Sequence, residues 1–197
     1  MGSETELAVF IVESVKLEDE KEGRKEEGRI LESILRLSEI RSQYWYIRTE
    51  RELEIVLEEF GTSRMRYLHL SCHANDERLG LTLDRVPFAR FGQLIRPYIG
   101  GRRLFLSACD ATNKELAQCV IPGSGCNSVI GPAGTIDFGD AAIFWASFYH
   151  LVFKLNPDAM QKRDIKAVLP RVCRTYGVKM RYFSKTENAP YYEEQDF

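Results

Sequence analysis

The chain alternates between short, nearly continuous apolar runs and longer stretches in which apolar residues recur at helical spacing. The runs predict strands covered on both faces, and the longer stretches predict amphipathic helices. The predicted strands comprise 7–12, 44–47, 66–72, 103–108, 128–131 and 178–183, with a further short strand at 80–84. The predicted helices comprise 29–37, 51–60, 88–99, 115–120, 140–155 and 164–176. Strands alternating with helices over long crossovers predict an α/β fold, a three-layer α/β/α sandwich with a mainly parallel sheet.

The domain organisation is simple. No repeat, low-complexity tract or linker divides the 197 residues, so we expect one domain over 1–197. Its polar end, 184–197, shows no periodicity and is predicted to be a loose tail. The charged stretch 18–27 is typical of a solvated loop or the start of a helix.

Composition and charge narrow the possible partners. Lys and Arg total 27 against 29 Asp and Glu, a net charge of −2 that argues against binding a nucleic-acid backbone. No apolar run is long enough to span a membrane, so no membrane partner is expected. The polar, acidic N-terminus lacks a secretory signal, which favours a cytoplasmic location. The five cysteines are therefore interpreted as thiols.

Two reactive side chains follow predicted strands. His73 comes directly after the strand at 66–72, and Cys109 after the strand at 103–108. In open α/β sheets reactive groups gather at the carboxyl ends of the strands, and neighbouring strands lie about 5 Å apart. If these two strands are adjacent, an imidazole and a thiol face one cleft. That is the minimum arrangement for a cysteine nucleophile with a base beside it.

Metal and nucleotide sites are not expected. His69 precedes His73 by four residues on the same strand face, about 13 Å away, and Cys72 points to the opposite face. These three side chains do not converge as zinc ligands must. The glycine-rich segments 123–125 and 131–134 lack the Lys-Ser/Thr ending and the spacing of phosphate-binding loops. No cofactor is therefore predicted.

The two strands with their reactive residues resemble motifs of a known family. Residues 66–74, RYLHLSCHA, resemble the apolar strand and histidine of the caspase-like (clan CD) cysteine peptidases, and 103–110, RLFLSACD, resemble their nucleophile strand. The CHAT-domain branch is the most similar, since its nucleophile strand reads Leu-Ser-Ala-Cys followed by an acidic residue. The similarity spans roughly 7–153. The sequence departs from the family at Cys72 and Ala74, which replace glycines that often flank the histidine.

The resemblance implies roles for residues of this chain. Cys109 would be the nucleophile of a cysteine endopeptidase and His73 its proton shuttle. The backbone N–H groups of Ala74 and Cys109 would stabilise the oxyanion, without any metal or cofactor. Some relatives bind a basic P1 residue, the substrate residue before the scissile bond, with acidic side chains. The counterparts expected here to bind substrate are Asp137, Asp110 and Asp140.

The resemblance also implies a setting. CHAT-type peptidases are often regulated bacterial effectors of defence or programmed cell death, so the expected partners are a protein or peptide substrate and an activating or regulatory protein. Two alternatives stay open. The departures at Cys72 and Ala74 are compatible with a degenerate domain that only binds proteins. A flavodoxin-like ligand-binding or signalling domain would carry the same Cys and His incidentally.

Overall fold

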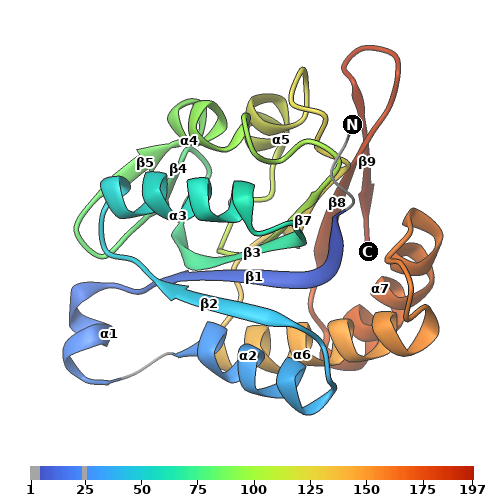
Figure 1. Ribbon diagram of the computed structural model, residues 1–197, viewed down its shortest axis with the longest axis horizontal. Coiled ribbons are helices and arrows are strands. Elements are labelled where there is room, and N and C mark those ends of the chain that lie inside the picture. The colour runs from blue at the N-terminus through green and yellow to red at the C-terminus, as the bar shows by residue number, and fades with distance from the viewer. Residues whose placement is uncertain (1–4, 24–25) are drawn as a thin grey trace.

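A computed structural model describes residues 5–23 and 26–197; positions 1–4 and 24–25, which include part of the acidic N-terminus and of the charged stretch, lie outside it. The main sheet has the strand order β2-β1-β3-β6-β7-β8-β9 (Figure 1). Its parallel strands are β1 (Glu6–Ser14), β2 (Ser42–Tyr46), β3 (Met65–Ala74), β6 (Arg103–Ser107) and β7 (Ser128–Pro132). Two antiparallel strands, β8 (Met180–Lys185) and β9 (Tyr192–Asp196), complete one edge.

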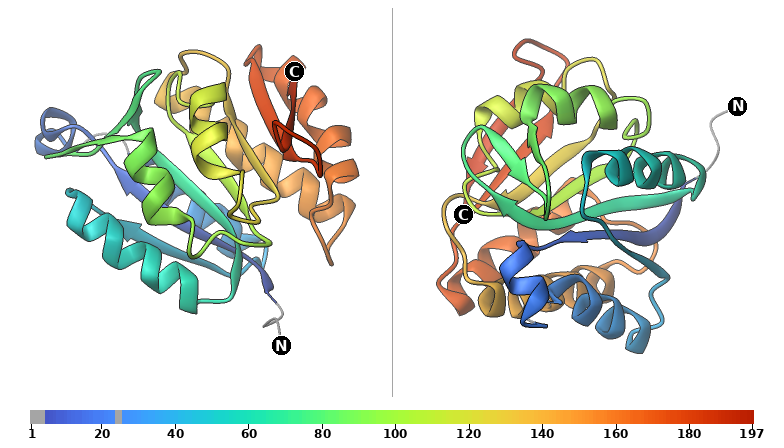
Figure 2. Two further views of the ribbon diagram at one scale, coloured as in Figure 1. Left: turned by 90° about the horizontal axis from the view of Figure 1, so that it is seen from above. Right: turned by 90° about the vertical axis from the view of Figure 1, so that its left-hand side faces the viewer.

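Helices cover both faces of this sheet (Figures 1 and 2). One layer contains α3 (Glu50–Thr62), α4 (Phe88–Ile95) and α5 (Lys114–Val120). The other contains α2 (Glu27–Leu37), α6 (Phe138–Leu155) and α7 (Lys162–Tyr176). A short helix, α1 (Leu17–Lys21), follows β1 directly. The predicted three-layer α/β/α sandwich with a mainly parallel sheet is confirmed. None of the helices in the described ranges has the length and apolar character needed to cross a membrane.

Each layer has its own core, and consecutive residues of a strand point into alternate cores. Phe10 of β1 packs in the core under α3, α4 and α5, whereas the next residue, Ile11, packs in the core under α2, α6 and α7. This alternation explains why the central strands are apolar at nearly every position. The second core is mainly aromatic around Phe105, whose ring contacts four others at centroid distances of 5.3–6.1 Å: Tyr67, Trp145, Phe148 and Tyr149.

The structure differs from the predicted elements in two places after β3. The short strand expected at 80–84 is instead a hairpin of β4 (Arg78–Gly80) and β5 (Arg85–Pro87), and the N–H of Leu81 donates to the carbonyl of Asp84 to close its turn. The helix expected over 88–99 ends at Ile95.

The prediction of a loose tail is wrong for β9. This strand pairs with β8 along five residues, and the Tyr192 ring meets the Phe183 ring edge-on at 5.3 Å. Arg181 forms ion pairs with Asp196 and Glu194 across the two strands. An edge strand needs only one buried face, so its sequence carries too few apolar residues to be recognised as a strand.

Candidate active site

Strands β3 and β6 bring His73 and Cys109 to the same end of the sheet. The two strands are adjacent and parallel, with Ser71 opposite Ser107. His73 and Cys109 each lie two residues further along, and neighbouring strands are about 4.8 Å apart. Both residues line one small cavity, whose volume of about 10 Å³ is the space of a single water molecule. The structure therefore unites the two residues that the sequence singled out.

The neighbouring thiol, Cys72, points to the other face of β3. It is buried in the core under α3, α4 and α5. Burial raises the pKa of the Cys72 thiol to about 12, and the charges of Glu27 and Cys109 add to this effect. A buried thiol that stays protonated is inert as a nucleophile, which leaves Cys109 as the candidate nucleophile of these two cysteines.

The sulfur of Cys109 lies against the segment that follows β7. It accepts a hydrogen bond from the Ile136 backbone N–H and donates one to the Ile136 carbonyl, both at 3.5 Å. A backbone N–H directed at sulfur stabilises negative charge there, as a thiolate nucleophile requires. Within the described part of the chain, the thiol hydrogen-bonds to Ile136 and not to His73. In this arrangement the thiol proton is directed at the Ile136 carbonyl.

His73 is oriented by a carboxylate that the sequence did not reveal. Nε2 of His73 lies 3.3 Å from Oδ2 of Asp19, and both side chains are mostly buried. On another side, the Phe138 ring meets the imidazole edge-on, with 5.2 Å between ring centroids. Asp19 lies on α1, within the charged stretch interpreted as solvated. Its only sequence signal was its place just after β1, the strand beside β3.

A second carboxylate, Glu27 of α2, lies beneath the pair. Its Oε2 accepts hydrogen bonds from the hydroxyls of Ser71 and Ser107, both 2.8 Å long. Its Oε1 lies 3.7 Å from Nε2 of His69, whose Nδ1 contacts the Tyr149 hydroxyl at 3.2 Å. Glu27 is 2 % exposed and lines the cavity with His73 and Cys109.

One of the two predicted oxyanion donors, the backbone N–H of Ala74, lies at the end of β3. Ala74 lies opposite Leu79 in the antiparallel pair of β3 and β4, next to a bond from the Asn75 N–H to the Arg78 carbonyl. Because the bonds of such a ladder fall on alternate residues, the Ala74 N–H points away from β4. That amide is therefore outside the ladder, as an oxyanion donor has to be.

Two of the three predicted acidic substrate-binding residues, Asp137 and Asp140, share a cavity with Cys109. Asp137 and Asp140 line a cavity of about 630 Å³ that Cys109 also lines, together with Lys179. Asp110 belongs to neither cavity that contains Cys109. It lies in an exposed turn with φ 56°, and its N–H donates to the carbonyl of Gly134. Gly134 also lines the cavity of Asp137 and Asp140, so this hydrogen bond places Asp110 at the margin of that cavity.

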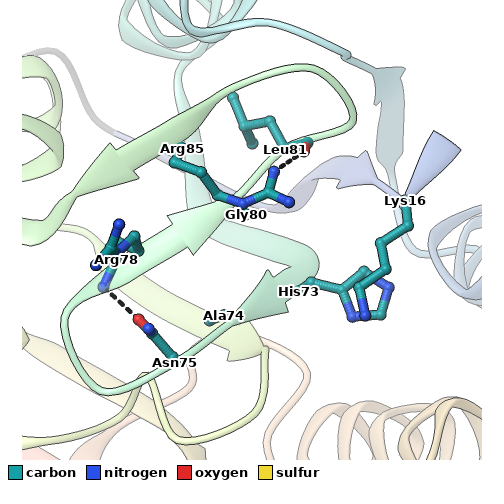
Figure 3. Close-up of a pocket in the computed structure, with 8 residues that line it drawn as sticks. All are labelled: Lys16, His73, Ala74, Asn75, Arg78, Gly80, Leu81 and Arg85. Atoms are coloured by element: carbon teal, nitrogen blue, oxygen red, sulfur yellow. Dashed lines mark hydrogen bonds between the residues drawn. The ribbon is translucent and has the colours of Figure 1, made fainter.

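A third cavity lies on the opposite side of His73. Its volume is about 250 Å³, and three cationic side chains line it with His73: Lys16, Arg78 and Arg85 (Figure 3). Lys16 precedes α1, whereas Arg78 and Arg85 come from the β4–β5 hairpin. This cluster could not be predicted from the sequence, because Lys16 is far from Arg78 and Arg85 in the chain.

Comparisons with known proteins do not assign the chain to a family. No protein-family model matches it, and no curated protein is significantly similar to it.

Proposed function

We propose that this protein is a cysteine endopeptidase of the caspase-like type, with Cys109 as nucleophile and His73 as proton shuttle. The observation that carries the proposal is the placement of both residues at the ends of adjacent parallel strands, where they line one cavity. Asp19 beside Nε2 of His73 adds the third group of a nucleophile–base–orienter arrangement. The resemblance of both strands to CHAT-domain peptidases supports the same function.

The proposed reaction uses only side chains and backbone of this chain. Because Nε2 is engaged by Asp19, Nδ1 is the nitrogen of His73 assigned to receive the proton of Cys109. The thiolate attacks the scissile carbonyl carbon, and backbone N–H groups stabilise the oxyanion. His73 then protonates the leaving amine as the C–N bond breaks, which leaves a thioester. Water, deprotonated by His73, attacks the thioester and releases the acid, and the proton returns to Cys109.

The contact between Cys109 and Ile136 fits an enzyme that needs activation. As long as the thiol donates its proton to the Ile136 carbonyl, that proton is not directed at the imidazole. Binding of a substrate or an activating protein that displaces the segment 133–137 would free the sulfur. This agrees with the regulated bacterial effector, in defence or cell death, that the resemblance implies.

An electrophilic peptide probe tests the proposal. Peptide acyloxymethyl ketones of varied sequence are incubated with the protein, and the modified residue is found by mass spectrometry. We expect labelling at Cys109 that is abolished in Cys109→Ala and His73→Ala. Cys119→Ala is the matched control, because Cys119 is also a half-buried thiol, and it should label like the wild type. Labelling that survives His73→Ala would overturn the assignment of His73.

A second candidate is a degenerate domain that binds a protein through the same cleft. The bond of the Cys109 thiol to Ile136, in place of one to His73, favours it specifically. This candidate predicts that a partner is bound equally well by the wild type and by Cys109→Ala, and that neither fragments it. Fragments produced by the wild type alone would exclude it.

A further inference from the structure

We infer that the cavity on the His73 side is a subsite for an acidic side chain of the substrate. It is the cavity of about 250 Å³ lined by Lys16, Arg78 and Arg85 (Figure 3). The inference deepens the proposed function and rests on it. The substrate would then need two charged residues: the basic P1 residue that Asp137 and Asp140 are expected to bind, and an acidic residue for this cavity.

The cavity has a positive charge that the protein leaves largely uncompensated. None of the described residues that line it is acidic. Arg78 is paired with Glu77 at 3.0 Å, but no carboxylate in the described ranges forms an ion pair with Lys16 or Arg85. Cations gathered around a concave surface without counter-charges attract an anionic group, and the walls strengthen that attraction.

Backbone carbonyls hold the Arg85 guanidinium in place. Nη1 of Arg85 donates to the carbonyls of Leu81 and Asp84, both at 2.9 Å, which leaves the rest of the guanidinium for a ligand. The side chain of Asn75 accepts the backbone N–H of Arg78 at 2.9 Å and so fixes the turn before β4. A guanidinium held in this way can form charge-assisted hydrogen bonds to a carboxylate at a small entropic cost.

The position of the cavity ties it to the reacting pair. His73 lines both this cavity and the one it shares with Cys109. The acidic cavity with Asp137 and Asp140 also contains Cys109. A peptide lying across His73 and Cys109 therefore meets positive charge on one side and negative charge on the other. The matching substrate has an acidic residue on the opposite side of the scissile bond from a basic one.

A carboxylate fits this cavity better than a nucleic acid. Three cations around one small cavity match a single anionic group, whereas a nucleic-acid backbone needs a track of positive charge. The chain as a whole has a net charge of −2, which opposes such binding.

Two peptide libraries test the subsite. In the first, the active protein cleaves a randomised library, and mass spectrometry of the products gives the preference at each position. We expect Asp and Glu to exceed Asn and Gln about 10-fold at one position, since a charge-assisted hydrogen bond is worth about that factor. Lys16→Glu should remove this acidic preference, because the new carboxylate offsets the charge of Arg78 or Arg85. Lys16 is exposed, so this variant is expected to fold, and Arg36→Glu on α2 is the matched exposed control.

In the second library, immobilised Cys109→Ala captures uncleaved peptides, so the subsite is tested without catalysis. Enrichment of acidic peptides that is lost in Cys109→Ala/Lys16→Glu supports the subsite even if the active protein cleaves nothing, in which case only the proposed function fails. Cleavage with no acidic preference at any position overturns the subsite and leaves the peptidase intact. Capture of no peptides, or capture without enrichment of acidic over neutral peptides, also overturns it.

Discussion

Ser71 and Ser107 lie opposite each other on adjacent parallel strands, and both hydroxyls donate to the same oxygen of Glu27. One buried carboxylate therefore joins β3, β6 and α2. His73 and Cys109 come two residues after these serines, on the same face of their strands. The strand ends that carry His73 and Cys109 are consequently joined by a polar contact inside the sandwich as well as by the sheet.

The first prediction concerns this contact. Glu27→Ala leaves the hydroxyls of Ser71 and Ser107 buried without an acceptor, so we expect the free energy of unfolding to fall by about 2–4 kcal/mol. Urea unfolding measures the loss. Glu26→Ala is the control, because Glu26 is the exposed neighbour at the start of α2, and it should unfold like the wild type. A Glu27→Ala protein as stable as the wild type would contradict the bridging role of Glu27.

The second prediction concerns the orientation of His73. Asp19→Asn keeps the size of the side chain at 3.3 Å from Nε2 but removes its negative charge. Without that charge the imidazolium formed during proton transfer is less stable, and we expect Cys109 to react with the peptide probe about tenfold more slowly. Glu18→Gln alters the exposed neighbour on α1 and should leave the rate unchanged. Equal rates in Asp19→Asn and the wild type would remove Asp19 from the site.

The sequence predicted the architecture because apolar runs report burial on both faces. The run at 7–12 and the one at 103–108 both proved to be central strands. His73 at the end of β3 and Cys109 after β6 came together because adjacent parallel strands end at one edge. Asp19 and Glu27 were missed for the opposite reason. In a stretch rich in charge, nothing local distinguishes a solvated carboxylate from one that tertiary packing buries.

The third prediction concerns the aromatic core. The Phe105 ring is fully buried and contacts the rings of Tyr67, Trp145, Phe148 and Tyr149. Phe105→Ala leaves a cavity that these large rings cannot fill, so we expect a loss of about 3–5 kcal/mol in the free energy of unfolding. Ile143→Ala on α6 is the control; that side chain is 53 % exposed and should cost less than about 1 kcal/mol. If both variants lose the same free energy of unfolding, Phe105 is not the centre of this core.

The fourth prediction concerns pH and Glu13, a carboxyl buried between β1 and α2. Burial raises its pKa from 4.5 to about 7, although the Gly28 N–H and the Tyr44 hydroxyl both donate to it. Between these two values the folded protein holds a proton that the unfolded chain has lost. The stability due to Glu13 is therefore complete below pH 4.5 and declines as the pH rises through 7, in total by about 3 kcal/mol at 1.4 kcal/mol per pKa unit. In urea unfolding from pH 4.5 to 8, Glu13→Gln should lose this decline and exceed the wild type in stability at pH 8. Glu59→Gln, at an exposed position on α3, is the control, and its free energy of unfolding should fall with pH as in the wild type. If the free energy of unfolding of Glu13→Gln also falls with pH as in the wild type, Glu13 is ionised in the folded protein throughout this range.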